Sequence, residues 1–134
     1  MHKQIFVNLP VADLQKSITF FKNLGFEFNP QFTNEQGAGM VISESIYAML
    51  LTHDFFQTFT TKTIADARKT TEVLVCLSCE SRSEVDALVA KAVAAGGTAP
   101  RTPQDHGFMY AHGFEDIDGH FWELVYMVEQ VSAA

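Results

Sequence analysis

The chain has 134 residues, a formal net charge of −7 and an apolar fraction of 47%. This length suits one domain with a sizeable core, and the acidic balance argues against a nucleic-acid partner, which would want a basic patch. No apolar run approaches the roughly 20 residues of a membrane span. The apolar run near the start of the chain is too short for a secretory signal. We therefore expect a cytoplasmic protein.

The first part of the chain predicts the order strand, helix, strand, strand, strand. Residues 4–9 alternate as a strand that Pro10 ends, because proline cannot donate to a strand ladder. Asp13 is the expected N-cap of a helix that closes at Gly25. Three short strands are then expected at 26–28, 40–43 and 46–52.

Residues 54–71 differ in character and form a predicted connector. The segment carries Phe55, Phe56 and Phe59 among threonines, so it is expected to pack rather than to hang free as a linker. A helical turn is expected at 64–67. The connector is interpreted as a tucked-in crossover, with a lid over a cleft as the alternative.

The second part repeats the order of the first. Its predicted elements are a strand at 72–79, a helix from Ser81 to Gly96, an extended piece at 98–103 and strands at 108–115 and 120–127. Phe6 and Leu74 hold matching places in the two copies. The pattern predicts an α+β fold of two βαβββ modules, with helices on the outer face of a cup-shaped mixed sheet. The expected bounds within one domain, 1–134, are 1–53, connector 54–71, 72–128 and a fraying tail, 129–134.

Cys76 and Cys79 stand in C-x-x-C spacing inside a predicted strand. Residues three apart on a strand point to opposite faces, so the two thiols cannot converge on a metal ion. They are interpreted as small core residues.

Glu123 lies in the stretch D-I-D-G-H-F-W-E-L-V, where Asp118-Gly119 indicates a turn before the last strand. Strand alternation puts Phe121, Glu123 and Val125 on one face. A carboxylate with apolar neighbours costs free energy unless something binds its charge, it stays protonated, or it sits at a wet rim.

Two stretches, V-N-L-P-V-A-D-L-Q-K-S-I-T-F-F-K-N-L-G-F and F-E-D-I-D-G-H-F-W-E-L-V, carry a family resemblance over essentially the whole chain. They resemble the glyoxalase, bleomycin-resistance and extradiol-dioxygenase superfamily, also called vicinal oxygen chelate proteins, and most of all its bacterial lactoylglutathione lyase-like branch. The resemblance implies two βαβββ modules forming a cup, and commonly a homodimer.

In the metal enzymes of that family, the first and last strand of each module supply histidine or glutamate ligands to a divalent ion. The resemblance places Phe6, Leu50, Leu74 and Glu123 at those positions. Three apolar side chains and one carboxylate do not make a divalent-ion site, so no metal ligand and no cofactor is predicted.

Tyr110 and His112 are candidate partners of Glu123 in proton transfer, if their shared strand face is the cleft face. If it is not, they are outer-face groups. Strand pairing cannot be fixed from the sequence to better than one residue.

Two functions remain open. In the first, the cup holds a small, partly apolar ligand without a metal, lined by Phe6, Asn8, Leu50, Leu74, Phe121 and Glu123. In the second, the protein is a glyoxalase-type lyase or isomerase in which Glu123 is the general base and a divalent metal is held weakly.

Overall fold

The computed structural model describes residues 1–128, which form two compact units that divide between Ala65 and Asp66. The division falls inside the predicted connector, 54–71. The predicted tail, 129–134, lies outside the described residues.

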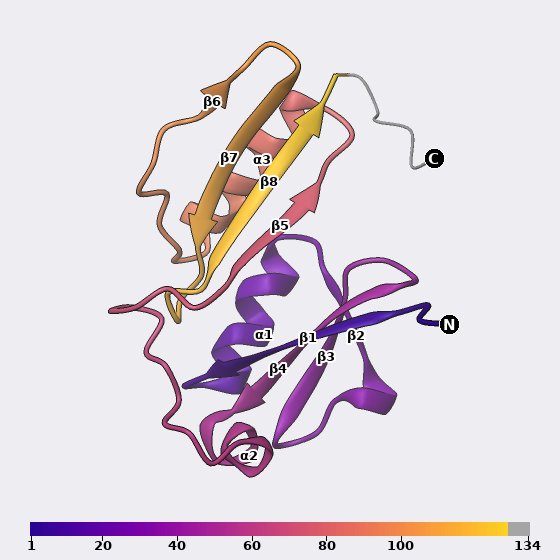
Figure 1. The fold of residues 1–134 in the computed structure, drawn as a ribbon, viewed down its shortest axis with the longest axis vertical. Helices are drawn as coiled ribbons and strands as arrows, with labels where there is room; N and C mark the ends of the chain where they lie inside the picture. Colours follow the sequence, from indigo (N-terminus) through magenta and orange to yellow (C-terminus); the bar gives the residue numbers. More distant parts are fainter. Residues whose placement is uncertain (129–134) are drawn as a thin grey trace. The chain divides into compact units, whose positions relative to one another are not determined.

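The first unit is a four-stranded mixed sheet with one long helix (Figure 1). Its strands lie in the order β1-β4-β3-β2, with β1 parallel to β4 and the other neighbours antiparallel. The elements are β1 (Ile5–Val11), α1 (Leu14–Asn23), β2 (Glu27–Asn29), the short helix η1 (Pro30–Phe32), β3 (Gly37–Val41), β4 (Ile46–Thr52), α2 (His53–Phe56) and η2 (Gln57–Phe59).

The second unit repeats this topology, with strand order β5-β8-β7-β6 and β5 parallel to β8. Its elements are β5 (Leu74–Ser78), α3 (Arg82–Ala94), β6 (Gln104–Asp105), β7 (Met109–Glu115) and β8 (Phe121–Met127). The predicted α+β class and the two βαβββ modules are thereby confirmed. The cup that the two sheets were expected to form stays a prediction.

Both long helices begin and end as the sequence predicts. The Asp13 side chain accepts a hydrogen bond from the Lys16 amide, and the Ser81 side chain accepts one from Glu84, so each satisfies a donor of the first helical turn. Past the helix ends, Gly25 and Gly96 have φ of 102° and 112°, a conformation that only glycine adopts without strain.

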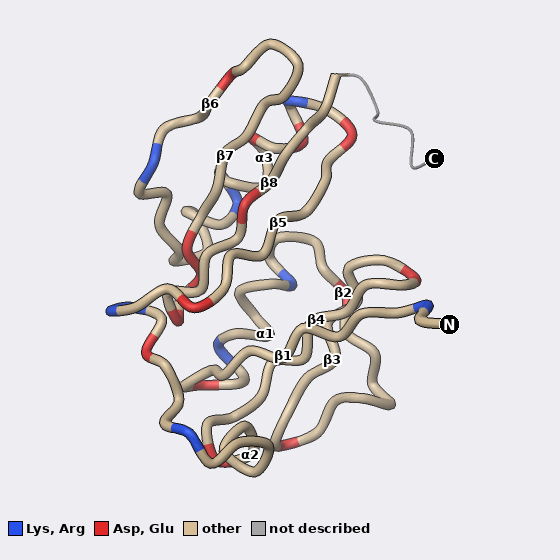
Figure 2. Tube along the Cα trace, in the orientation of Figure 1, with Lys and Arg blue, Asp and Glu red and all other residues tan. Residues whose placement is uncertain are grey.

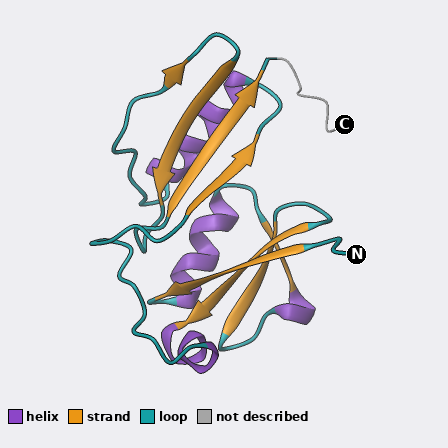
Figure 3. Ribbon diagram, in the orientation of Figure 1, coloured by secondary structure: helices purple, strands orange, loops and turns teal. Residues whose placement is uncertain are grey.

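Each sheet has one face against a helix and one face away from it (Figure 3). In the first unit α1 packs on β3 and β4, and in the second α3 packs on β7 and β8. Alternate strand residues on these helix-side faces are buried and form the two cores. The largest of them are Leu9, Met40 and Leu50 in the first unit and Phe114, Trp122 and Leu124 in the second. We call the opposite faces the open faces.

Three local predictions differ in detail from the structure. Pro10 does not end its strand, since β1 continues to Val11; β1 is an edge strand, where a missing ladder donor is tolerated. The helical turn expected at 64–67 begins two residues later, where the Asp66 carbonyl oxygen accepts from the Lys69 and Thr70 amides. The short strand or extended piece expected at 98–103 pairs through an isolated bridge from Thr98 to Glu115, and β6 follows directly after it.

No helix within residues 1–128 is both long enough and apolar enough to cross a membrane.

Candidate functional site

The open face of the second sheet is fixed by the pairing of β5, β8 and β7. Leu74 lies opposite Phe121, and Cys76 lies opposite Glu123, whose partner on the other side is Gly113. Leu74 is 59% exposed, while Phe121 and Glu123 are half-buried. The predicted alternation of β8 and the predicted placement of Leu74 and Glu123 on one face agree with this register.

The Glu123 carboxylate makes no hydrogen bond or ion pair with any residue in the part of the chain that the structure describes. Its neighbours on the same strand face, Phe121 and Val125, are apolar. A half-buried carboxylate with apolar neighbours keeps a desolvation cost that a partner in solution could offset. Glu123 is therefore a charged group of this face that no described residue neutralises.

Cys76 and Cys79 are free thiols, and the interpretation of both as core residues is wrong. Cys76 is exposed on the open face and Cys79 is half-buried just after β5. Burial and then the Glu123 charge raise the pKa of Cys76. Burial and the Glu84 carboxylate, which accepts a hydrogen bond from the thiol, raise the pKa of Cys79 to about 11. Both thiols are thus poorly ionised near neutral pH.

Tyr110 and His112 lie on the helix side of the second sheet, away from Glu123. The Tyr110 hydroxyl donates to Asp86 Oδ1 of α3 at 2.6 Å, and this hydrogen bond raises the pKa of Tyr110. His112 Nε2 lies 3.1 Å from the Arg101 carbonyl oxygen. In the pairing of β7 with β8, Gly113 and not Tyr110 or His112 shares the face of Glu123. The expectation that Tyr110 or His112 assists Glu123 is therefore corrected.

The turn before β8 is held by a buried carboxylate that sequence reasoning did not single out. Asp116 Oδ1 accepts from the Asp118 and His120 amides, and Oδ2 accepts from Trp122 Nε1 at 3.0 Å. Burial raises the pKa of Asp116, while the His120 charge and these hydrogen bonds act in the opposite direction. Because Trp122 is adjacent to Glu123 in sequence, this network fixes the start of the strand that carries the carboxylate.

The connector reaches the same turn from the other side. Gly119 has φ of 89°, and a Cβ there would lie 3.0 Å from the Arg68 amide nitrogen. The Arg68 guanidinium also donates to the Ile117 carbonyl oxygen at 2.6 Å. Only a glycine allows this close approach, so the D-G pair does more here than form a turn.

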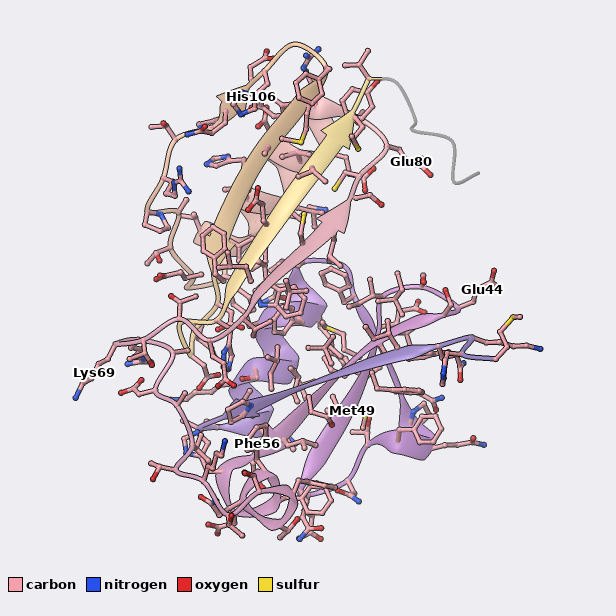
Figure 4. All side chains as sticks on the ribbon, viewed as in Figure 1. Glu44, Met49, Phe56, Lys69, Glu80 and His106 are labelled. Carbon is pink, nitrogen blue, oxygen red and sulfur yellow. The ribbon has the colours of Figure 1, made fainter. Side chains whose placement is uncertain are left out.

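The open face of the first sheet is aromatic. Phe6 lies opposite Tyr47 and stacks on it, with ring centroids 4.9 Å apart and an interplanar angle of 12°. Asn8 lies opposite Met49, which Figure 4 labels on β4. Phe6 is 44% exposed and Asn8 is exposed, so both side chains are accessible on this face as predicted.

The prediction that Leu50 lines the open side is wrong. Leu50 lies opposite Leu9, has 0% exposure and belongs to the helix-side core. The predicted register of β4 was shifted by one residue, and a shift of one residue moves a side chain to the other face of the sheet. Met49 takes the open-side place.

The comparisons with known proteins agree with this fold. Residues 3–43 match the family model described as bleomycin resistance protein-like N-terminal. A hypothetical protein from S. aureus is 30% identical, with 94% of each chain covered and a TM-score of 0.80. The chain belongs to the vicinal oxygen chelate superfamily.

More distant members of the superfamily share the fold alone. A glyoxalase/bleomycin resistance protein/dioxygenase family enzyme from Burkholderia phytofirmans PsJN is 17% identical, with a TM-score of 0.77 over 92% of this chain and 97% of that one. A glyoxalase-related enzyme from Fulvimarina pelagi is 20% identical, with a TM-score of 0.78 over 99% and 94%. No curated protein sequence matches the chain.

The side chains at the superfamily's metal-ligand positions do not fit a divalent ion. Equivalent pairings in the two sheets place Met49 of β4 where β8 carries Glu123, and the first strands offer Phe6 and Leu74. One carboxylate, one thioether and two hydrocarbon side chains lack the oxygen and nitrogen donors that such ions need. Within residues 1–128, no three His, Cys, Asp or Glu side chains gather where they could hold a metal.

Proposed function

We propose that this superfamily member is a binding module that holds a small, partly apolar organic molecule on its open sheet faces without a metal ion. The observation that carries the proposal is the unpaired Glu123 carboxylate among the apolar side chains of Phe121, Val125 and the exposed Leu74. Phe121 and Leu74 are the proposed apolar contacts beside it. Phe6 and Asn8 are the proposed contacts on the first sheet, where Tyr47 extends the aromatic surface.

The energetics favour a ligand with a hydrocarbon or aromatic body. Burial of apolar surface contributes roughly 25 cal/mol per Å², and Leu74 and Phe6 leave large fractions of their side chains exposed. A small-molecule site is mostly apolar, with a few polar groups that fix orientation. Asn8 is the polar group proposed for that role on the first open face, and Glu123 is the one proposed on the second.

The second candidate is a glyoxalase-type lyase or isomerase with Glu123 as general base, because an unpaired carboxylate can accept a proton. The arrangement gives this candidate less support than binding. An enediolate needs a metal ion or preorganised donors, and the side chains at the ligand positions do not fit the ion. Tyr110 and His112, which could have moved a proton, contact α3 and the Arg101 loop instead.

The proposal is tested by thermal-shift screening of chelator-treated protein against a library of neutral aromatic and aliphatic compounds. We expect some of them to raise the melting temperature in the absence of metal, because a ligand that binds only the native state stabilises it. Variants Phe6→Ala and Leu74→Ala, with the exposed Val93→Ala on α3 as control, show which face is used.

The lyase candidate is tested on the same preparation with the methylglyoxal–glutathione adduct and elemental analysis. Stoichiometric divalent metal together with turnover that chelation abolishes would overturn the binding-module proposal. The homodimer implied by the superfamily stays a prediction, which sedimentation velocity can check.

A further inference from the structure

The second open face brings an aromatic ring and an unpaired carboxylate together. A Cβ built on Gly113 would lie 2.6 Å from Phe121 Cζ and 3.0 Å from Cε1, so the Phe121 ring occupies the space above that glycine. Glu123, directly opposite Gly113, is the next residue of β8 on the same face. Side chains two apart on a strand start about 6.6–6.8 Å from each other. A single small molecule can therefore touch both the ring and the carboxylate.

The charges on this face have one sign. The open-face residues of β5, β7 and β8 include no lysine, arginine or histidine. They are Leu74, Cys76, Ser78, Met109, Ala111, Gly113, Glu115, Phe121, Glu123, Val125 and Met127. Figure 2 shows the acidic colour on β8 and no basic colour along β5. Glu115 accepts a hydrogen bond from the Thr98 hydroxyl at 3.4 Å, which leaves Glu123 as the unpaired charge.

The cysteine beside Glu123 does not change the charge of this face. Burial and the Glu123 charge keep the Cys76 thiol protonated, so it is neutral beside the carboxylate. Arg82 pairs with Asp105 on the helix side and also lies over the Tyr110 ring, so this cation is directed away from Glu123. Among the described residues no cation pairs with Glu123, which leaves a ligand to supply the complementary charge.

Resting on the proposed function, we infer that the ligand of this face is an organic cation, a primary or secondary ammonium on an apolar or aromatic body. Its N–H groups donate charge-assisted hydrogen bonds to Glu123, which are about twice as strong as neutral ones. The Phe121 ring attracts the same positive charge through its negative face. The hydrocarbon body covers Leu74 and Val125, which carry no polar atoms. An anionic ligand would instead meet two carboxylates of its own sign.

The inference is tested by calorimetric titration with three probes of matched shape. The probes are phenethylammonium, the neutral phenethyl alcohol and the anionic hydrocinnamate. We expect the ammonium to bind wild-type protein about tenfold more tightly than the alcohol, the anion to bind weakest, and the preference to shrink as salt screens the charges.

Two variants and a matched control locate the effect. Glu123→Gln should weaken ammonium binding about tenfold and leave the alcohol within about twofold. Glu80→Gln removes the same charge from the exposed loop after β5, labelled in Figure 4, and should change neither. Phe121→Leu should weaken binding of the ammonium more than binding of the alcohol. Phe121→Tyr, which keeps the aromatic ring, should bind the ammonium as tightly as wild type does. Melting temperatures confirm that each variant folds.

The outcomes separate this inference from the proposed function. If the alcohol binds as tightly as the ammonium, or if Glu123→Gln and Glu80→Gln act alike, the inference of a cationic ligand is wrong. The proposal that the protein binds a small apolar molecule then still stands. The same conclusion follows if the three probes fail and a neutral library compound binds. If no compound binds chelator-treated protein, both proposals fall.

Discussion

The two sheets carry the same pairings and different chemistry. On the helix side, Leu9 lies opposite Leu50 in the first sheet and Leu77 lies opposite Leu124 at the equivalent place in the second. One residue earlier, on the open side, the pairs are Asn8 with Met49 and Cys76 with Glu123.

This difference shows where the repeat is constrained. A helix-side residue must fill a defined volume in a close-packed core, so leucine opposite leucine suits both copies. Open-side residues such as Phe6, Asn8 and Glu123 lie outside these cores, so the same volume does not constrain them. The first sheet offers a stacked aromatic pair and no acid within β1, β3 and β4, while the second offers the unpaired carboxylate. Each prediction below removes or exposes one part of this contrast.

The largest expected effect on stability tests whether Leu50 or its neighbour Met49 is buried in the core. Leu50→Ala should lower the free energy of unfolding by about 2–5 kcal/mol, since it leaves a cavity in a close-packed region. Met49→Ala, on the open face, should cost less than about 1.5 kcal/mol, because a half-exposed side chain buries less surface. Urea denaturation of both variants measures the difference. Equal costs would show that the register of β4 differs from the one described.

The second prediction compares the two hairpin turns. Asp116→Asn should cost about 1–3 kcal/mol, because an amide NH₂ would face the Trp122 N–H and leave a buried donor unsatisfied. The turn between β3 and β4 has the exposed Glu44, whose backbone carbonyl accepts from the Tyr47 hydroxyl. Glu44→Gln should therefore change the unfolding free energy by less than about 0.5 kcal/mol. A variant Asp116→Asn as stable as wild type would contradict the role assigned to this carboxylate.

The sequence carried enough information for the fold, because periodicity, caps and the repeat all agree. Asp13, Ser81 and the paired glycines mark both helices, and the alternation of β8 puts Phe121 and Glu123 on one face. These are local signals, read within one element, and the second copy of the module repeats them independently.

The candidate site was harder to predict, because it depends on contacts between strands. Leu50 and Met49 are equally apolar, so only the pairing of β4 with β1 decides which one faces the helix. The same holds for Tyr110 and His112 on β7. Once β7 is paired with β8, Gly113 faces Glu123's side and the two ring residues do not.

For Cys76 two signals in the sequence disagreed. Strand alternation places Cys76 on the same face as Leu74, which is the open face. Small, apolar cysteines are usually buried, and that habit prevailed over the parity of the strand.

The third prediction concerns the pH dependence of the turn that Asp116 holds. Burial raises the folded-state pKa of Asp116 above its ordinary 3.8, so between these values the folded state binds more protons than the unfolded one. The stability that Asp116 contributes is thus fully present below pH 3.8 and decreases as pH rises through its folded pKa. The cost of Asp116→Asn should accordingly shrink from acidic to neutral pH. A cost that grows with pH would reverse the sign argued here.

The smallest effect concerns the thiols on either side of β5. Alkylation requires the thiolate, and Cys76 is exposed whereas Cys79 is half-buried with its pKa raised to about 11. Iodoacetamide should therefore modify Cys76 first, as mass spectrometry of peptides can measure. Glu123→Gln should accelerate modification of Cys76 alone, because it removes one cause of that thiol's raised pKa, and Glu84→Gln should accelerate Cys79 alone. If both variants act equally on both thiols, Glu123 does not lie beside Cys76 and the charge of the second open face is elsewhere.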